Sequence, residues 1–328
     1  MKPYNELTRR GKLRRQRQLA LKALEYYDLD VKDFRLLAAG INTIYRIDTQ
    51  GGEKYAMRIY SPEETVLQDN QAEIFWLKAL NRDTDLRVPE PIPQRSGAYI
   101  TIQDHPYIPG ERRCVVFKWI PGRSLAYYLS PEKYNKLGEI MARLHTHAES
   151  LHVPHNIQPK RWDKVFYYPD EPVVIYDEQY RHLFSPERVE LLEDAISISS
   201  CALSELHEDD EGRILIHGDL HYWNVHLYRG ELYINDFEDI MLGYPVQDVA
   251  VTLSYGRTRD DYSKLREAFQ EGYTNIRTWP VVSTRQLETL ITARNINFIN
   301  YIARVIPDPE EMLENRFENL KTYLYAYG

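Results

Sequence analysis

The residue types and spacing between positions 216 and 239 are the most informative feature of the chain. Asp219 follows Ile216-His217-Gly218, Asn224 lies five positions later, and Asp236 lies twelve positions beyond Asn224. Phosphoryl transfer needs a carboxylate that orients the attacking hydroxyl and accepts its proton, and hard oxygen ligands that hold Mg²⁺ against the phosphates. An aspartate and an asparagine on one loop, with a second aspartate after the next strand, supply these groups. The spacing therefore predicts a phosphoryl-transfer site.

The stretch from Ile216 to Val225 resembles the catalytic loop of the kinase-like phosphotransferases of the aminoglycoside phosphotransferase and choline kinase type. In that family H-G-D-x-x-x-x-N stands where protein kinases have H-R-D-x-x-x-x-N. The resemblance implies that Asp219 is the catalytic base and that Asn224 and Asp236 bind the metal. Gly218 in place of arginine favours the branch that acts on small molecules, and His217 is expected to be a structural brace.

Two segments nearer the N-terminus fit the nucleotide-binding part of the same family. Leu36–Tyr45 resembles the hairpin that covers the phosphates, which implies that Gly40 supplies flexibility and that backbone N–H groups around Asn42 meet phosphate oxygens. Arg58 lies where protein kinases place the lysine that clamps ATP, and a guanidinium binds phosphate bidentately and stays charged. Glu73, in the helix that follows, is the expected ion-pair partner of Arg58.

Three later positions have expected structural or binding roles. Val115–Leu125 resembles the family's hinge, which implies that adenine pairs with backbone groups near Phe117 and Lys118. His145 is expected to pack in the core. Asp248 is expected to cap a helix and to brace the catalytic loop. The resemblance as a whole implies ATP and Mg²⁺ as cofactors.

Short strands and turns must position the first of these segments, whereas helical periodicity dominates from Pro131. The pattern predicts strands at 34–38, 43–49, 55–60, 98–103, 113–119, 214–216 and 231–235, and helices over 6–27, 61–80, 131–149 and 186–206 and after residue 247. Together with the resemblance, which spans about residues 30–255, this implies an α+β protein with a two-lobed, protein-kinase-like fold. Its N-lobe would hold an antiparallel β-sheet, and its C-lobe would be mainly helical.

We expect the chain to divide into three parts. These are a basic N-terminal helix at 1–30, a nucleotide-binding N-lobe at 31–117, and a helical C-lobe at 118–328 that contains the catalytic loop and the substrate site. Residues 2–22 contain eight basic residues and one acid, Glu6. A solvated helix face explains this charge more simply than contact with nucleic acid.

The charge of the chain is unevenly distributed. The net charge is −8, with +4 over residues 1–120 and −12 over residues 121–328. A basic first part suits a polyphosphate such as ATP, and an acidic second part suits a cationic or metal-bound partner. We therefore expect a small hydroxyl-bearing acceptor, such as an amine-bearing alcohol, an aminoglycoside or another sugar-like molecule. The acidic and aromatic residues that suit a cationic acceptor are Asp239, Asp260, Asp261, Glu267, Glu271, Trp162, Tyr222, Trp223 and Trp279.

Two other functions fit parts of the sequence. A Ser/Thr protein kinase would share the catalytic motif, but Gly243 follows Asp236 within seven residues, which leaves no evident activation segment. A non-catalytic nucleotide-sensing or nucleic-acid-binding protein is disfavoured because the base and metal positions are all intact. The two cysteines form no C-x-x-C pair and no run of about 18 apolar residues occurs, so we expect a cytoplasmic protein with no membrane partner.

Overall fold

The computed structural model describes residues 2–168 and 171–328 and divides into two compact units. The first unit comprises Met1–Arg123, Pro154–Gln158 and His226–Glu238, and the second comprises Ser124–Val153, Pro159–Val225 and Asp239–Gly328. The first unit therefore includes the N-terminal helix, which the sequence treats as a separate part. It also includes the hairpin after Val225, which the sequence places with the helical part.

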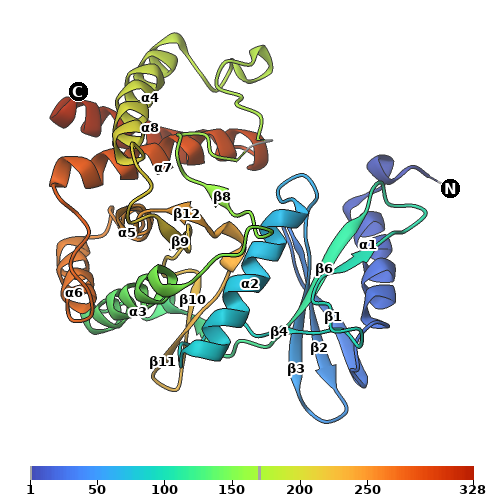
Figure 1. Ribbon diagram of the computed structural model, residues 1–328. Helices are drawn as coiled ribbons and strands as arrows, with labels where there is room; N and C mark the ends of the chain where they lie inside the picture. The colour runs from blue at the N-terminus through green and yellow to red at the C-terminus, as the bar shows by residue number, and fades with distance from the viewer. Residues whose placement is uncertain (1, 169–170) are drawn as a thin grey trace. The chain divides into compact units, whose positions relative to one another are not determined.

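A six-stranded sheet forms the centre of the first unit (Figure 1). Its path is β1-β2-β3-β6-β4, with β5 also paired to β6, and these pairings are antiparallel in the described residues. Alternate residues of β2 are buried, as a strand with one covered face requires. The strands are β1 (Val31–Ala39), β2 (Thr43–Thr49), β3 (Lys54–Ile59), β4 (Pro91–Ile92), β5 (Thr101–Gln103) and β6 (Arg112–Lys118).

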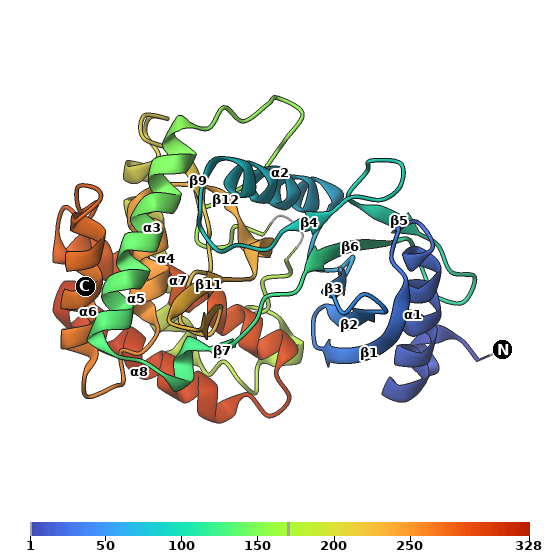
Figure 2. The same cartoon turned by 90° about the horizontal axis from the view of Figure 1, so that it is seen from below.

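Two helices flank this sheet, as Figures 1 and 2 show. Helix α1 (Arg9–Leu24) buries Leu19, Ala20 and Ala23 against apolar side chains of β2, β3 and β6. Helix α2 (Leu67–Asp83) carries the fully buried Trp76, whose ring packs edge-on against Phe237 with 5.7 Å between centroids. The sheet therefore separates the apolar core under α1 from the side that faces α2.

Helix α2 begins later than the sequence predicts. A helix start at Ser61-Pro62 is expected, but residues 62–64 form a turn and the first helical residue is Leu67. The Ser61 N–H donates to Oδ1 of Asn42 at 3.0 Å, and the Val66 N–H donates to Oδ2 of Asp69 at 2.9 Å. The side chain that satisfies an N-terminal donor of the helix is thus Asp69, and the segment from Ser61 is held by the first hairpin instead.

A short hairpin separates the two parts of the motif region. Strand β10 (Val225–Tyr228), which the sequence did not predict, pairs with β11 (Glu231–Ile234) and with β7 (Arg123–Ser124). The two residues that connect β10 to β11, Arg229 and Gly230, both have positive φ, at 51° and 83°. Positive φ at both positions is typical of a tight turn whose twist matches the strands. The hairpin places Asn224 just before β10 and Asp236 just after β11.

The second unit is mainly helical. Serine residues cap three of its helices: Ser130, Ser185 and Ser283 each accept a hydrogen bond from a backbone N–H three positions later. A small sheet has the order β8-β12-β9. The elements are α3 (Pro131–Ser150), β8 (Lys160–Arg161), α4 (Pro186–Leu206), β9 (Ile214–Ile216), β12 (Met241–Gly243), α5 (Pro245–Ser254), α6 (Tyr262–Thr274), α7 (Thr284–Val305) and α8 (Glu310–Tyr327).

Helices α3 and α6 lie unusually close together. A Cβ at Gly138 of α3 would collide with the Phe269 carbonyl, and a Cβ at Gly272 of α6 would collide with the Asn135 carbonyl. Glycine at both positions lets the two backbones approach, which fixes the packing of the helix that carries His145.

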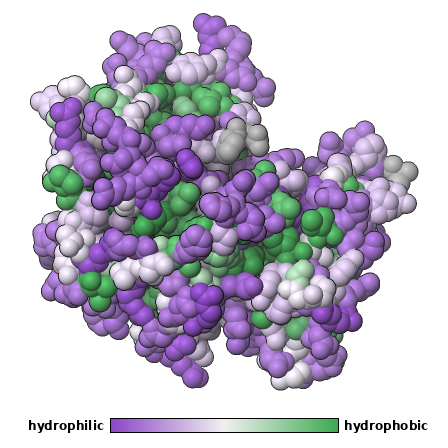
Figure 3. All heavy atoms as spheres, in the orientation of Figure 1, coloured by the Kyte–Doolittle hydropathy of each residue, from purple (hydrophilic) through white to green (hydrophobic). Residues whose placement is uncertain are grey.

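Helix α7 has a mixed character. Most of its residues are buried, yet the buried set includes the polar side chains Arg294, Asn295, Asn297 and Asn300. Polar groups in such positions need hydrogen-bond partners, so these side chains mark α7 as an element that can contribute to a binding site. Hydrophilic residues cover most of the surface visible in Figure 3. Among the described residues, no helix combines the length and the apolar character that crossing a bilayer requires.

Candidate active site

Asp219 lies in the loop between β9 and β10 and is held by three side chains of the second unit. Its Oδ1 accepts a hydrogen bond from Nη2 of Arg294 at 2.9 Å. Its Oδ2 accepts one from Nδ2 of Asn224 at 3.0 Å and lies 3.3 Å from Nε2 of His221. Because Nδ1 of His221 accepts the Trp223 N–H at 3.2 Å, Nε2 is the ring nitrogen that directs a proton toward Asp219.

These contacts set the protonation state of Asp219. Burial by itself would raise the pKa of Asp219, but the charge and hydrogen bond of His221 and the charge of Arg294 outweigh burial and lower the pKa to about 2. The side chain keeps 18% of its surface exposed. Asp219 is therefore a carboxylate at neutral pH that is fixed in orientation and accessible to another molecule.

Asp248 braces the loop that contains Asp219. Its carboxylate accepts the backbone N–H groups of His217 at 2.9 Å and Gly218 at 2.8 Å, and it also contacts Nε2 of His145 at 3.1 Å. Burial would raise the pKa of Asp248, but the hydrogen bond and charge of His145 lower it. The expected bracing role is present. The expected helix cap is not, because Asp248 is the fourth residue of α5 and Gln247 instead accepts the Tyr244 N–H at 2.8 Å.

His145 and His217 are both fully buried. Nδ1 of His145 lies 2.9 Å from the Tyr273 hydroxyl, so both ring nitrogens of His145 have partners in the core, as expected for a packing residue. Nδ1 of His217 accepts the Asp219 N–H at 3.3 Å. This contact makes His217 a brace of the loop.

Gly218 is required by the local backbone. Its φ is +77°, and a Cβ there would collide with the Asp239 carbonyl oxygen. L-residues other than glycine adopt such a φ only at a cost. The glycine therefore turns the chain so that Asp219 follows in its observed orientation.

In the first unit, Arg58 joins three carboxylates on the face of the sheet that α2 covers. Its guanidinium lies 3.1 Å from Oε1 of Glu73, 3.2 Å from Oδ1 of Asp236 and 3.6 Å from Oε2 of Glu238. The Tyr60 hydroxyl donates to the other oxygen of Glu73 at 2.5 Å. Burial would lower the pKa of Arg58, but Glu73 and Asp236 raise it well above its ordinary value. The pairing of Arg58 with Glu73 is the one that the sequence predicts.

Asp236 has an unusual backbone conformation. Its φ is +59°, in the left-handed region that non-glycine residues seldom adopt, and its side chain is 45% exposed. Strained residues of this kind cluster at functional sites, because the surrounding structure must maintain them. The conformation directs one carboxylate oxygen to Arg58 and keeps the side chain accessible.

The first hairpin places no steric demand on Gly40. Gly40 has no positive φ, and in the described part of the chain no atom other than those of its sequence neighbours lies within 4 Å of a Cβ built on it, so neither strain nor close approach requires glycine there. Its N–H donates to the Asn42 carbonyl at 3.1 Å. Asn42 has a structural role of its own, since its side chain accepts the Ser61 N–H and donates to Glu238.

Two backbone N–H groups at the end of β6 are already used within the protein. The Lys118 N–H donates to the Glu90 carbonyl at 2.8 Å, and the Trp119 N–H donates to the Lys54 carbonyl at 3.0 Å, so neither donor is available to a base. The next N–H, that of Ile120, has no backbone acceptor in the described part of the chain. The buried ring of Phe117 lies 5.5 Å from the Arg58 guanidinium and so contributes packing at this position.

Each unit presents one oxygen-bearing side chain of a kind that binds Mg²⁺, Asn224 in the second unit and Asp236 in the first. Asn224 turns Nδ2 toward Asp219, which leaves Oδ1 directed elsewhere, and Asp236 presents an accessible carboxylate. Within the described ranges, no three His, Cys, Asp or Glu side chains group as a metal site. Mg²⁺ commonly binds one or two protein oxygens and completes its shell with substrate phosphates and water, so each of these side chains has the chemistry that suits this ion.

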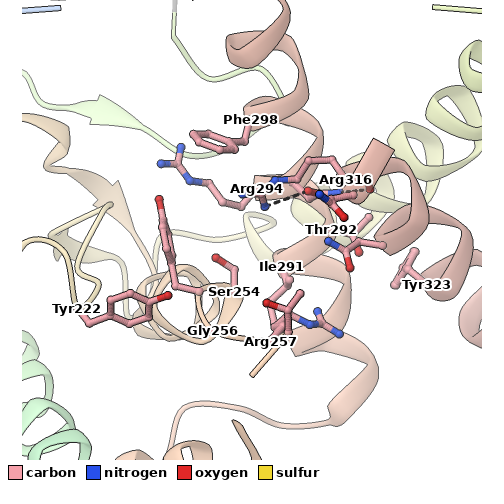
Figure 4. Close-up of a pocket in the computed structure, with 15 residues that line it drawn as sticks. Tyr222, Ser254, Gly256, Arg257, Ile291, Thr292, Arg294, Phe298, Arg316 and Tyr323 are labelled. Atoms are coloured by element: carbon pink, nitrogen blue, oxygen red, sulfur yellow. Dashed lines mark hydrogen bonds between the residues drawn. The ribbon is translucent and has the colours of Figure 1, made fainter. Parts of the chain in front are cut away.

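A pocket of about 450 Å³ lies within the second unit (Figure 4). Its walls are Tyr222 of the catalytic loop, residues 254–258 after α5, and side chains of α7 and α8. Arg294 lines the pocket and also contacts Asp219, which makes the pocket adjacent to the catalytic loop. Of the acidic and aromatic residues expected to contact an acceptor, Tyr222 lines this pocket, whereas Trp162 is buried in the core and Asp239 is bound by Tyr168 and Lys160.

The sequence profile of the phosphotransferase enzyme family (APH) matches residues 33–283. The chain belongs to this family. The phosphotransferase is also 25% identical over 268 residues to a protein of Synechocystis sp. (strain PCC 6803) described as "Uncharacterized protein sll1119", with 81% of this chain and 72% of the relative covered.

Two solved structures show the same fold. One, of amicoumacin kinase hAmiN in complex with AMP-PNP, Ca²⁺ and Ami, has a TM-score of 0.78 and 17% identity, and covers 96% of each chain. The other, of a microcompartment-associated aminopropanol kinase, has a TM-score of 0.77 and 21% identity, and covers 93% of this chain and 94% of that one. The phosphotransferase thus has the α+β, two-lobed, protein-kinase-like fold that the sequence implies.

Sequence reasoning missed two charged residues of the phosphotransferase. Arg294 is 75 positions beyond Asp219, and Glu238 is next to the motif but was given no role. A signal for Arg294 existed: it is an arginine inside the apolar periodicity of a long helix, where an unpaired charge would be costly. No local pattern names its partner, however, because the pairing depends on how α7 packs.

Proposed function

We propose that this phosphotransferase is an ATP- and Mg²⁺-dependent kinase that transfers the γ-phosphoryl group of ATP to a hydroxyl of a small molecule. The observation that carries the proposal is the Asp219 carboxylate, held by Arg294, Asn224 and His221 in a segment that the family profile matches. The two structural relatives, described as an amicoumacin kinase and an aminopropanol kinase, support a small acceptor.

Asp219 would act on the acceptor. With a pKa of about 2 it is a weak base, so its main contribution is to orient the hydroxyl through a hydrogen bond and to receive the proton as the oxygen–phosphorus bond forms. Arg294 and Asn224 keep the carboxylate in one orientation, which lowers the entropic cost of reaching the reactive geometry.

The first unit would bind the nucleotide. Arg58 would contact the phosphates, with Glu73 and Tyr60 holding the guanidinium in place. Backbone groups around Asn42 would cover the phosphates, and Ile120 just beyond Phe117 and Lys118 would offer the N–H for adenine. Asn224 and Asp236 would hold Mg²⁺, which when bound neutralises phosphate charge and polarises the transferring group.

The second candidate function from the sequence is a Ser/Thr protein kinase. The secondary structure after Asp236 disfavours this function. Strand β12 begins at Met241 and α5 begins at Pro245, so the segment after Asp236 leads directly into regular structure. An activation segment that could bind a peptide has no room between these elements.

The proposal is tested by measuring ADP release with Mg-ATP against a panel of amino-alcohols, hydroxy acids, sugars and aminoglycosides. Asp219→Ala should lower kcat by at least about 10²-fold while ATP affinity, measured by calorimetry, stays within about twofold. Asp194→Ala, at an exposed position on α4, is the matched control and should retain full turnover. Undiminished turnover in the Asp219 variant would remove the mechanism.

A further inference from the structure

The charge of the pocket beside Asp219 differs from that of the whole second unit. Three arginines line it, Arg257, Arg294 and Arg316, and no aspartate or glutamate of the described chain is among its lining residues. Resting on the proposed function, we propose that this pocket binds an anionic group, a carboxylate or a phosphate, of the hydroxyl-bearing acceptor. This acceptor class differs from the cationic one that the overall charge suggests.

Two of the three arginines already have carboxylate partners in the protein. Arg294 pairs with Asp219 at 2.9 Å, and Arg257 pairs with Glu288 at 2.7 Å. The positive charges of these two residues are therefore balanced before any ligand binds.

Arg316 on α8 is different. Its Nη1 donates to Oδ1 of Asn295 at 3.3 Å, and its guanidinium lies 4.6 Å from the centre of the Phe298 ring, so its contacts in the described chain are a neutral amide and an aromatic face. Burial lowers the pKa of Arg316, and the like charge of Arg294 lowers it further. A partly buried guanidinium without a carboxylate partner is costly, and an anionic ligand would remove that cost.

The neighbouring side chains suit an anion. Asn315 and Asn319 lie on the same helix within one turn of Arg316 and line the same pocket, as does Thr292 of α7. Figure 4 shows Arg316 on the α8 side of the pocket and Tyr222 on the opposite side. Amide and hydroxyl donors around a planar guanidinium are the groups that bind carboxylate or phosphate oxygens.

The pocket also has the right position for an acceptor. Arg294 belongs to the pocket wall and contacts Asp219 directly, and the Tyr255 ring in the same wall stacks on His221 with 3.7 Å between centroids. An acceptor whose anionic end contacts Arg316 would extend toward Asp219 and could place its hydroxyl there. A volume of about 450 Å³ suits a small molecule. A cationic acceptor would instead meet the positive charge of Arg316, which has no carboxylate partner in the described part of the chain.

A matched series of three-carbon diols tests this inference by calorimetry and thermal shift without nucleotide. Glycerate carries a carboxylate, glycerol 3-phosphate carries a phosphate, glycerol is neutral, and 3-amino-1,2-propanediol is cationic. We expect one of the two anions to bind at least tenfold more tightly than glycerol and the amine, and the preferred anion identifies the group. Equal binding of all four, or tightest binding of the amine, overturns the inference.

Variants of Arg316 test whether the anion binds in this pocket. Arg316→Gln should weaken anion binding at least tenfold and leave glycerol binding unchanged, and Arg316→Lys should recover part of the affinity because it keeps the charge. Lys321→Gln, an exposed position on the same helix, is the control and should bind as the wild type does. Anion affinity that is unchanged in a folded Arg316→Gln protein contradicts the assignment.

Binding and turnover separate this inference from the proposed function. Asp219→Ala should bind the anion yet lack turnover. If anion binding depends on Arg316 but no acceptor releases ADP, the proposed function fails and the pocket assignment stands. If an acceptor is phosphorylated equally by wild type and Arg316→Gln, the pocket assignment fails and the kinase function stands.

Discussion

Nη2 of Arg294 lies 2.9 Å from Oδ1 of Asp219 and so ties helix α7 to the loop between β9 and β10. The two residues are 75 positions apart in the sequence. The ion pair keeps Asp219 ionised, fixes one of its two oxygens and leaves the other near His221 and Asn224. It also connects the carboxylate to the wall of the neighbouring pocket.

Removing the cation of this pair should impair both catalysis and stability. We expect Arg294→Ala to lower kcat at least about tenfold because Asp219 loses its fixed orientation, and to lower the free energy of unfolding by roughly 3 kcal/mol because a buried ion pair loses one partner. ADP-release kinetics and urea unfolding measure the two effects. Arg285→Ala, at an exposed position on the same helix, should change neither quantity appreciably.

Removing Glu73 should disturb nucleotide binding through Arg58. Glu73 is buried and contacts both Arg58 and Tyr60, so Glu73→Ala leaves the guanidinium free to move toward Asp236 and Glu238. We expect ATP affinity to fall about tenfold, which corresponds to about 1.4 kcal/mol. Calorimetric titration with Mg-ATP measures this, with Glu63→Gln at an exposed loop position as the control. Unchanged affinity would show that Arg58 does not contact the phosphates.

Substitution by alanine should be harmful at Gly218 and harmless at Gly40. Gly218→Ala meets both a positive φ and a collision with the Asp239 carbonyl, so we expect a loss of roughly 1–3 kcal/mol of stability and a large loss of kcat. Gly40→Ala meets neither and should retain stability and ATP affinity. Thermal unfolding and ATP titration of the two variants, side by side, give the comparison. Loss of ATP affinity in Gly40→Ala would instead support the sequence-based prediction that Gly40 gives the hairpin a flexibility needed for ATP binding.

The carboxylate of Asp248 should make stability depend on pH in acid. Its folded pKa is lowered, so its stabilising contribution is complete above the unfolded value of about 3.9 and is lost as pH falls through the lower folded pKa. We expect Asp248→Asn to be markedly less stable than wild type at pH 7, with a difference that shrinks below about pH 4. Urea unfolding at a series of pH values measures this.

The control for that series is Asp260→Asn, whose exposed side chain should give no pH-dependent difference. A stability difference that stayed constant down to pH 3 would contradict the ionised state of Asp248 in the fold.

The sequence determined the features that depend on local chemistry. The spacing of Asp219, Asn224 and Asp236 is fixed by one loop and one short hairpin, so it could be recognised without coordinates. The sequence pattern predicted a strand at 43–49 and helices that begin at 131 and 186, and these match β2, α3 and α4. These signals are carried by residues within a few positions of one another.

The tertiary structure decided what depends on contacts between distant segments. In the folded chain Arg294 contacts Asp219. The Ser61 N–H donates to Asn42, and α2 begins only at Leu67. The Lys118 N–H donates to the Glu90 carbonyl. It also gathered arginines around a pocket in a part of the chain whose total charge is negative. Neither a net charge nor a local motif specifies which distant side chains come into contact. The packing of α7 and α8 determines which side chains meet.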